Sequence, residues 1–203
     1  MRNPFAPFEM IPPIRADFDA TTGRFPQATG HYQKTLDDLE GLYHDQDAFA
    51  AMLLEGRGRV VYEVWEHRAS KDSGDLVFGT SVMQSGRVGC EFFLTRGHQH
   101  LIADRAETYY CLSGSGLVLM ESPEGESKVL EQIPGQLVYV PPRWIHRSIN
   151  TGDSVLTTLF CYNADAGQDY EIIRQRGGMR KLIVTDGSGG WTLEDNPNYV
   201  SPA

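Results

Sequence analysis

Four residues of the chain have types and spacings that point to metal chemistry. Two histidines are separated by a single residue, a glutamate follows, and a third histidine lies farther along; they are His98, His100, Glu107 and His146. Three imidazoles and one carboxylate suit a borderline divalent transition metal. We expect one such ion per chain, with Fe2+ or Mn2+ favoured and Ni2+, Co2+ or Zn2+ also compatible with these ligands.

A strand would explain the spacing of the first two histidines. Side chains two residues apart on a strand point to the same face, so the rings of His98 and His100 can converge. A glutamate and a third histidine from other strands can close the site from the side. The ligands therefore predict a framework of strands around them.

Strand-like segments do recur along most of the chain. They are rich in β-branched and aromatic residues and are separated by turn sequences. The expected strands are 60–66, 76–83, 90–95, 108–114, 116–121, 136–142, 147–150 and 155–162, followed by a short helix at 169–177 and a final strand at 179–186. Many short strands at near-regular spacing predict an antiparallel sandwich or barrel.

The N-terminal segment is expected to differ from this pattern. We divide a single domain into residues 1–58, an arm and a helix, and residues 59–203, the barrel on which they pack. Residues 1–35 are rich in proline, glycine and aromatics, which predicts an ordered but irregular arm. Its phenylalanines should pack on the barrel or on a second subunit; they are Phe5, Phe8, Phe18 and Phe25.

A helix is expected at 44–56, before the first strand of the barrel. Asp45 can cap its start and Gly56 can end it. Phe49 would lie on its apolar face together with Met52 and Leu53.

Composition limits the partners and the compartment. The net charge of −9 leaves no general basic surface for nucleic acid. No apolar run approaches the roughly 18 residues that a membrane span needs, and the N-terminus does not have the pattern of a signal peptide. Three cysteines without a framework spacing favour reduced thiols and a cytoplasmic protein. We therefore expect no nucleic-acid partner and no membrane partner.

Two larger patterns surround the candidate ligands. The order glycine, HxH, glutamate, glycine, followed by glycine, proline, histidine, asparagine, resembles the paired motifs of the cupin superfamily. Four longer segments together resemble the cupin-type phosphoglucose isomerases. They are GRVGCEFFLTRGHQH, ETYYCLSGSGLVLM, PGQLVYVPPRWIHRSINTGDSVL and FCYNADAGQDYEIIRQRGGMRKLIV. The resemblance runs from about Tyr62 to Asn196.

This resemblance implies a fold and an activity. The fold would be an all-β cupin barrel, a double-stranded β-helix or jelly roll, with an N-terminal extension that contains a short helix. The activity would be a metal-dependent aldose–ketose isomerisation of glucose 6-phosphate and fructose 6-phosphate through a cis-enediol, in glycolysis and gluconeogenesis. A homodimer is also expected, because cupins often pair through strand edges and an aromatic arm can cover a partner's edge.

The resemblance also implies roles for individual residues. It makes the three histidines and Glu107 the metal ligands, with Glu107 also the best candidate for the base. It places Thr95 and Gly97 beside the sugar phosphate, with Thr80 or Ser81 from the preceding strand. The residues expected around the sugar are Tyr62, Tyr109, Tyr162, Gln168 and Tyr170, and Tyr162 is assigned to catalysis with Glu107.

The chain departs from the family pattern at two informative positions. Gln168 stands where the family has histidine, and glutamine can form hydrogen bonds but cannot titrate near neutral pH. Arg143 stands where many cupins have glycine.

Two alternative functions use the same ligands: a cupin dioxygenase that activates O2 at iron, and a non-catalytic cupin that binds a sugar phosphate. Anaerobic turnover would separate the first of these from an isomerase.

Overall fold

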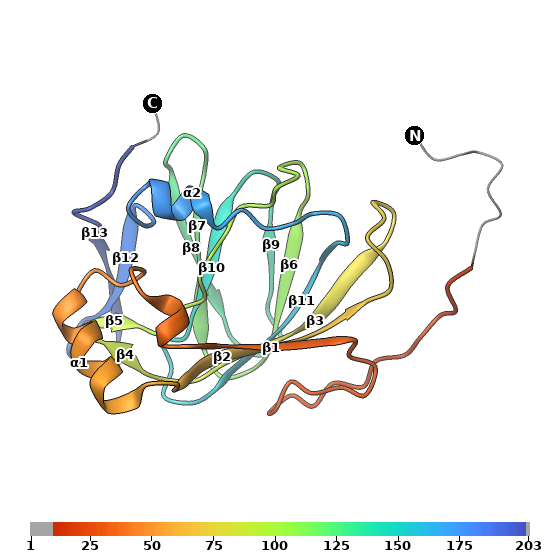
Figure 1. Cartoon of the computed structure of the whole chain (residues 1–203), viewed down its shortest axis with the longest axis horizontal. Coiled ribbons are helices and arrows are strands. Elements are labelled where there is room, and N and C mark those ends of the chain that lie inside the picture. Colours follow the sequence, from red (N-terminus) through yellow and green to blue (C-terminus); the bar gives the residue numbers. More distant parts are fainter. Residues whose placement is uncertain (1–9, 202–203) are drawn as a thin grey trace.

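The computed structural model describes residues 10–201, which form strands with a few short helices (Figure 1). The strands are β1 (Gly30–Thr35), β2 (Val60–Arg68), β3 (Leu76–Met83), β4 (Arg87–Val88), β5 (Glu91–Phe92), β6 (Glu107–Ser113), β7 (Gly116–Glu121), β8 (Ser127–Gln132), β9 (Leu137–Val140), β10 (Ile145–Ile149), β11 (Leu156–Asn163), β12 (Lys181–Thr185) and β13 (Trp191–Asp195). The helices are the 3-10 turn η1 (Asp37–Leu39), α1 (Gln46–Gly56) and α2 (Glu171–Gln175).

The strands pair in three antiparallel sheets. The largest has the order β1-β2-β3-β11-β6-β9, the second β10-β7-β8 and the third β13-β12-β5-β4. Every residue of β7 and of β10 is buried, and β3 and β11 bury most of theirs. One apolar core joins the first two sheets and includes Met83, Val138, Leu117 and Ile149. This packing confirms the all-β barrel expected from the sequence.

The expected strands of the barrel are largely confirmed, with a few differences. Residues 90–95 contribute only the two residues of β5, and β8 and β13 form where no strand was expected. Both of these are edge strands with exposed, mostly polar residues. A strand that buries little apolar surface has a weak sequence signal, which is why these were missed.

The irregular arm expected for residues 1–35 is wrong for its last six residues. Residues 30–35 form β1, which pairs with β2 from Gly30 opposite Glu66 to Thr35 opposite Val60. The strand has exposed, polar residues and becomes regular only because β2 offers it a free edge. The boundary between residues 58 and 59 stays a prediction.

The aromatic residues of the arm pack on the barrel where the structure describes them. The rings of Phe18 and Phe25 are 4.7 Å apart, and both lie within 6.3 Å of the ring of Phe78 on β3. Phe5 and Phe8 lie outside the described residues. The arm therefore covers the outer end of β3, as expected for Phe18 and Phe25.

The expected helix before the barrel is confirmed as α1, which lies beside β4 at one end of the molecule (Figure 1). The Asp45 side chain accepts a hydrogen bond from the backbone N–H of Ala48 at 2.9 Å and caps the helix. Phe49 is buried, and the last helical residue is Gly56. Among residues 10–201, no helix is both long and apolar enough to cross a membrane.

Candidate metal centre and substrate pocket

The four candidate metal ligands converge from three segments of the chain. Glu107 opens β6 and His146 lies in β10, whereas His98 and His100 precede β6 outside any regular strand. The strand expected for the two histidines is replaced by isolated bridges, which pair His98 with His146 and Gln99 with Asp169. The backbone N–H groups of His98 and His146 each donate to the other's carbonyl, at 3.0 and 2.9 Å. These reciprocal bonds hold two ligands side by side.

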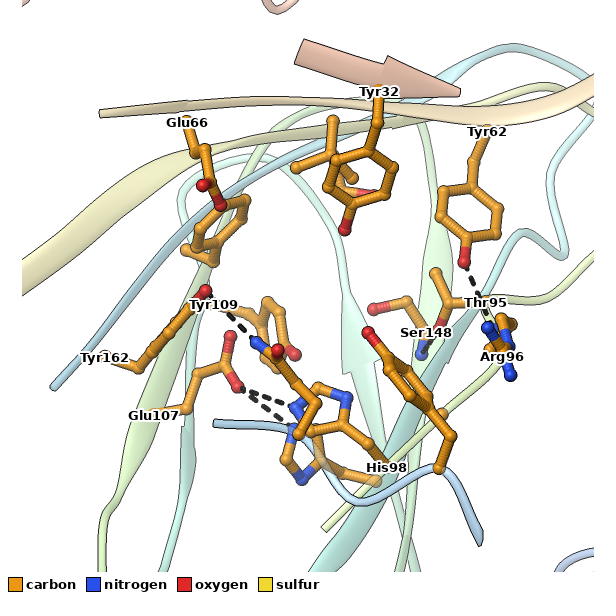
Figure 2. A pocket seen from close by; sticks show the side chains of 17 residues that line it. Tyr32, Tyr62, Glu66, Thr95, Arg96, His98, Glu107, Tyr109, Ser148 and Tyr162 are labelled. Atoms are coloured by element: carbon orange, nitrogen blue, oxygen red, sulfur yellow. Dashed lines mark hydrogen bonds and ion pairs between the residues drawn. The ribbon is translucent and has the colours of Figure 1, made fainter. Parts of the chain in front are cut away.

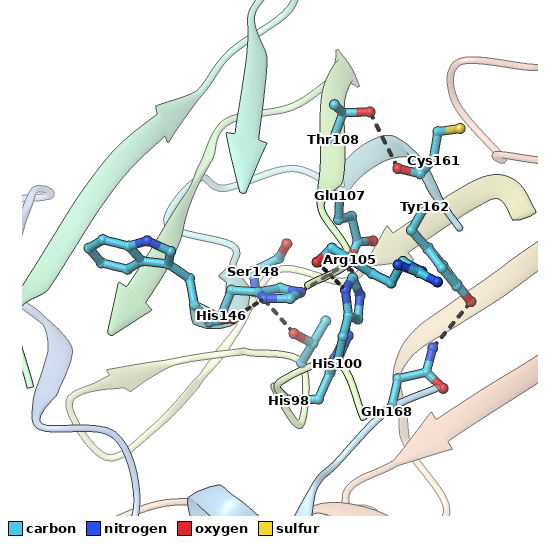
Figure 3. Close-up of polar contacts among 12 residues, drawn as sticks. His98, His100, Arg105, Glu107, Thr108, His146, Ser148, Cys161, Tyr162 and Gln168 are labelled. Atoms are coloured by element: carbon cyan, nitrogen blue, oxygen red, sulfur yellow. Dashed lines mark hydrogen bonds and ion pairs between the residues drawn. The ribbon is translucent and has the colours of Figure 1, made fainter. Parts of the chain in front are cut away.

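One candidate ligand atom from each of the four side chains lies within 4.8 Å of the others. The Oε2 atom of Glu107 is 3.0 Å from Nε2 of His146, 3.2 Å from Nε2 of His100 and 3.8 Å from Nε2 of His98. Glu107 and His146 are almost completely buried, at 3% and 1% exposure. Three imidazoles therefore surround one carboxylate oxygen inside the protein (Figure 3).

The hydrogen bonds on the far side of two rings show that the cluster fits a cation. Nδ1 of His100 lies 3.0 Å from the carbonyl of Arg105, and Nδ1 of His146 lies 3.0 Å from the carbonyl of Trp144. Because a carbonyl only accepts, each Nδ1 must carry hydrogen, which leaves Nε2 of a neutral ring as a lone pair. In the neutral rings those lone pairs would face a carboxylate that also only accepts, so each contact with Glu107 requires either a proton on Nε2 or a cation. A divalent metal would satisfy all of these atoms together.

His98 adds an independent sign of the same requirement. Its Nε2 atom is buried and has no hydrogen-bond partner among the described residues. A buried nitrogen without a partner is costly in a folded protein, but it is appropriate for a metal ligand. The cluster can therefore hold a metal ion.

The directions of the pKa shifts of His98 and Glu107 also suit metal ligands. Burial lowers the pKa of His98 well below its usual range, so this ring is neutral. Burial acts to raise the pKa of Glu107, but hydrogen bonds with His100 and His146 outweigh it and hold the pKa of this carboxyl well below its usual range. For His100, burial acts to lower the pKa, but its contact with Glu107 outweighs burial and raises it.

The cluster opens into a pocket that is lined by residues from several strands of the barrel. In Figure 2, Tyr32, Tyr62 and Glu66 enter from β1 and β2 and face His98 and Glu107 across the pocket. The figure also shows that one oxygen of Glu107 contacts two histidines, while the other carries no drawn contact and is turned toward the pocket.

Almost all of the sequence-predicted substrate residues line this pocket. They are Tyr62, Ser81, Thr95, Gly97, Tyr109, Tyr162, Gln168 and Tyr170. Thr80 does not: it is fully buried, and its hydroxyl donates to the carbonyl of Gly23 in the arm. Neighbouring residues on a strand point to opposite faces, so β3 directs Ser81 to the pocket and Thr80 away from it.

Three pocket hydroxyls are held so that their hydrogens remain available. The oxygen of Thr95 accepts from the backbone N–H of Ser148 at 3.1 Å, and the oxygen of Tyr62 accepts from that of Arg96 at 3.5 Å. The oxygen of Tyr162 accepts from two side chains, as described next. None of these hydroxyls donates to an acceptor within residues 10–201, so each can donate to a ligand. The buried hydroxyl of Ser81 has no partner in the same part of the chain.

Tyr162 lies at the centre of a small polar network. Its oxygen accepts from Nε2 of Gln168 at 3.2 Å (Figure 3). It also accepts from Nη2 of Arg68 at 3.3 Å. Arg68 also donates to the carbonyl of Ala164 and lies 3.5 Å from Glu66, a second pocket carboxylate. Burial raises the pKa of Tyr162 to about 12, so the phenol stays protonated and can donate.

Several pocket residues were missed from the sequence. They include Tyr32, Glu66, Arg96 and Ser148. Glu66 shares a face of β2 with Tyr62, and Ser148 shares a face of β10 with His146, so a period of two residues could have found both. Tyr32 was missed because its strand was not expected.

Comparisons with known proteins agree with this geometry. A sequence profile described as "Glucose-6-phosphate isomerase (GPI)" matches residues 33–200. The glucose-6-phosphate isomerase of Sinorhizobium medicae is 51% identical over 94% of this chain and 89% of its own length. The glucose-6-phosphate isomerase of Thermococcus onnurineus is 43% identical over 92% of this chain and 96% of its own length.

A more distant likeness was found to a solved structure of oxalate oxidase, with a TM-score of 0.47 and 13% identity over 58% of this chain and 59% of the other. That likeness is too weak to bear on the reaction. The sequence profile and the two isomerases together confirm the resemblance to cupin-type phosphoglucose isomerases. Because they match nearly the whole chain at high identity, the chain belongs to the glucose-6-phosphate isomerase family.

Proposed function

We propose that this protein is a metal-dependent aldose–ketose isomerase that interconverts glucose 6-phosphate and fructose 6-phosphate through a cis-enediol. Family membership supports this activity. The observation that carries the mechanism is the position of Glu107, which has one oxygen among three histidines and the other turned toward the pocket (Figure 2).

The reaction moves a proton between C2 and C1 of the open-chain sugar, so it needs a base near both carbons. A divalent metal held by His98, His100, Glu107 and His146 would supply a Lewis acid that stabilises charge developing on the sugar oxygens. Fe2+ or Mn2+ is our first choice for the ion. A carboxylate bound firmly to a metal is a poorer base, and the division of tasks between the two oxygens of Glu107 relieves this conflict.

Tyr162 is proposed to donate a hydrogen bond to a sugar oxygen. Its oxygen already accepts from Gln168 and Arg68, so its own hydrogen is directed elsewhere. Gln168 cannot carry a proton as a histidine would, and its role here is to orient Tyr162. The proton transfer is therefore assigned to Glu107 alone.

The sugar phosphate is proposed to bind at the opposite end of the pocket from Glu107. Thr95, Ser81 and Tyr62 have hydroxyl hydrogens free to donate, and Gly97 lies beside them. No lysine lines the pocket in the described part of the chain, so hydroxyl and backbone N–H donors would bind the dianion, together with Arg96, which also lines the pocket. Tyr109 and Tyr170 would flank the sugar.

The alternative functions receive no support from the comparisons. The matched family and the relatives reported above are named for isomerisation, not for oxygen chemistry. A non-catalytic sugar-binding protein would not need four converging ligands at the bottom of the pocket.

We also propose a cytoplasmic homodimer. The three cysteines are free, in keeping with a reducing compartment. The outer edges of the six-stranded sheet belong to β1 and β9, and an exposed strand edge favours pairing with a second copy.

The central experiment measures metal content and isomerase rate in the same sample. Purified protein should contain one divalent metal per chain and convert glucose 6-phosphate to fructose 6-phosphate in a coupled assay. Chelation should remove both, and adding back metal should restore the rate. His146→Ala should lose metal and activity together. His31→Ala is the matched control, because His31 pairs with Glu63 at the surface. A fully metal-loaded protein without activity on hexose phosphates would contradict the proposal.

A further inference from the structure

We infer that Arg147 is a positioning residue for the phosphate group, holding the Thr95–Gly97 loop from behind and placing a buried positive charge next to it. This inference rests on the proposed function, since it assumes that the loop binds the phosphate.

The direction of the Arg147 side chain follows from its place in β10. It is next to His146, and successive residues of a strand point to opposite faces. His146 faces the pocket, whereas Arg147 lines a separate hollow that also borders Tyr43 and Ile173, on the other side of the loop. Arg147 therefore cannot act as a direct ligand in the pocket and must act through the loop.

Two close approaches attach Arg147 to the loop. Its Nη2 donates to the backbone carbonyl of Arg96 at 2.8 Å. A Cβ added to Gly97 would lie 3.0 Å from both Cβ and Nε of Arg147, and 2.8 Å from Ile173. The absence of a side chain at Gly97 is thus what lets the arginine pack against the loop. Gly97 also has a φ of 71°, which itself favours glycine.

The charge of Arg147 has no carboxylate paired directly with it among the described residues. The side chain is 4% exposed, and no acidic group of residues 10–201 lies within ion-pair distance of it. Its Nε has no hydrogen-bond partner in the same residues. Glu91 and Glu121 act on this charge only without direct contact, and the buried Glu91 accepts the backbone N–H of His44.

A buried cation without a directly paired carboxylate is stabilised further when a ligand supplies negative charge nearby. The phosphate dianion expected beside Thr95 and Gly97 would supply this negative charge from the other side of the loop. Because the intervening region is largely shielded from water, the attraction is stronger than at the surface. In a trans peptide the N–H points away from the C=O, so the bond to the Arg96 carbonyl directs the N–H of Gly97 away from Arg147.

The test compares Arg147→Met with Arg143→Met. Both remove one positive charge beside His146, but Arg143 is exposed and does not line the pocket. The probe is sorbitol 6-phosphate, a non-isomerisable phosphorylated polyol, with its dissociation constant measured by calorimetry on metal-loaded protein. Arg147→Met should weaken binding on the order of tenfold to a hundredfold, and Arg143→Met should leave it within about twofold.

Three further readouts separate positioning from a general structural role. The KM for glucose 6-phosphate should rise in Arg147→Met much more than kcat falls, and metal content should not change. Arg147→Lys, which keeps the charge but not the rigid guanidinium, should lose less affinity than Arg147→Met. If Arg147→Met does not fold, Arg147→Gln keeps a polar side chain without a charge and should show a similar loss.

Equal binding of sorbitol 6-phosphate by the wild type and the neutral variants would overturn the inference, as would no binding by the wild type. Failure of the proposed function looks different. In that case the wild type would not isomerise hexose phosphates, yet phosphate binding that depends on Arg147 could still be measured.

Discussion

At the scale of single residues, Glu107 has two tasks that its two oxygens divide. Oε2 lies 3.0–3.8 Å from the three histidine Nε2 atoms, and the other oxygen is turned toward the pocket (Figure 2). The hydrogen bonds that depress its pKa keep it ionised, which is the form needed by both a ligand and a base.

Glu107→Gln should therefore lower kcat by several powers of ten, at about 1.4 kcal/mol per tenfold. The amide keeps the shape and one possible ligand oxygen but cannot accept the proton. Sorbitol 6-phosphate should still bind. Glu66→Gln makes the same change to a carboxylate of the same pocket that pairs with Arg68, and it should reduce kcat far less. Equal losses in the two variants would remove Glu107 from the role of base.

Gln168 marks where this chain departs from its family. It donates to the oxygen of Tyr162 and cannot titrate. Gln168→His introduces a ring with an ordinary pKa of about 6.5. If this position can exchange a proton with the sugar, kcat should rise or gain a new inflection near neutral pH. An unchanged rate and pH profile would show that the position only orients Tyr162.

At the scale of elements, a polar edge strand and a pair of backbone bridges assemble the site. β1 carries Tyr32 to the pocket, and the reciprocal hydrogen bonds between His98 and His146 replace a regular strand. α1 is farther from the site and contributes to stability through Phe49, which is buried against the barrel.

The cap of α1 offers a test of stability without a change in activity. Asp45→Ala removes the acceptor for the backbone N–H of Ala48 and should lower the free energy of unfolding by about 1 kcal/mol. Urea denaturation measures this change. Asp47→Ala, in the first turn but not at the cap, should cost only a few tenths of 1 kcal/mol. Isomerase kinetics should be the same in both variants, since neither residue lines the pocket.

At the scale of the whole molecule, the six-stranded sheet ends in β1 on one side and β9 on the other. Leu137 and Tyr139 lie on β9 and are 61% and 54% exposed. Apolar side chains at an exposed edge favour association with a second copy over contact with water.

Light scattering should accordingly give twice the mass of one chain across the micromolar range. The mass should not change when the metal is removed, because the ligands lie inside the barrel and not at its edges. A single-chain mass at these concentrations would contradict the homodimer.

The sequence by itself determined the chemistry of the centre. Donor atoms belong to residue types, so three histidines and a glutamate, with family-specific segments around them, specified the candidate ligands and the family before any geometry was known. It also determined most strands of the barrel, because β-branched and aromatic residues that bury against a core leave a clear pattern.

The tertiary structure alone decided which side chains meet. It selected Ser81 over Thr80 and directed Arg147 away from the pocket that His146 enters, because strand register sets the face to which each residue points. The polar residues of β1 form a strand because β2 offers a free edge, and this strand carries Tyr32 to the pocket. The tertiary structure also held His98 against His146 by backbone bonds between distant segments, which no local pattern records. The type of a residue sets which chemistry it can perform. The direction of its side chain and the residues near it depend on pairing between segments that are distant in the sequence.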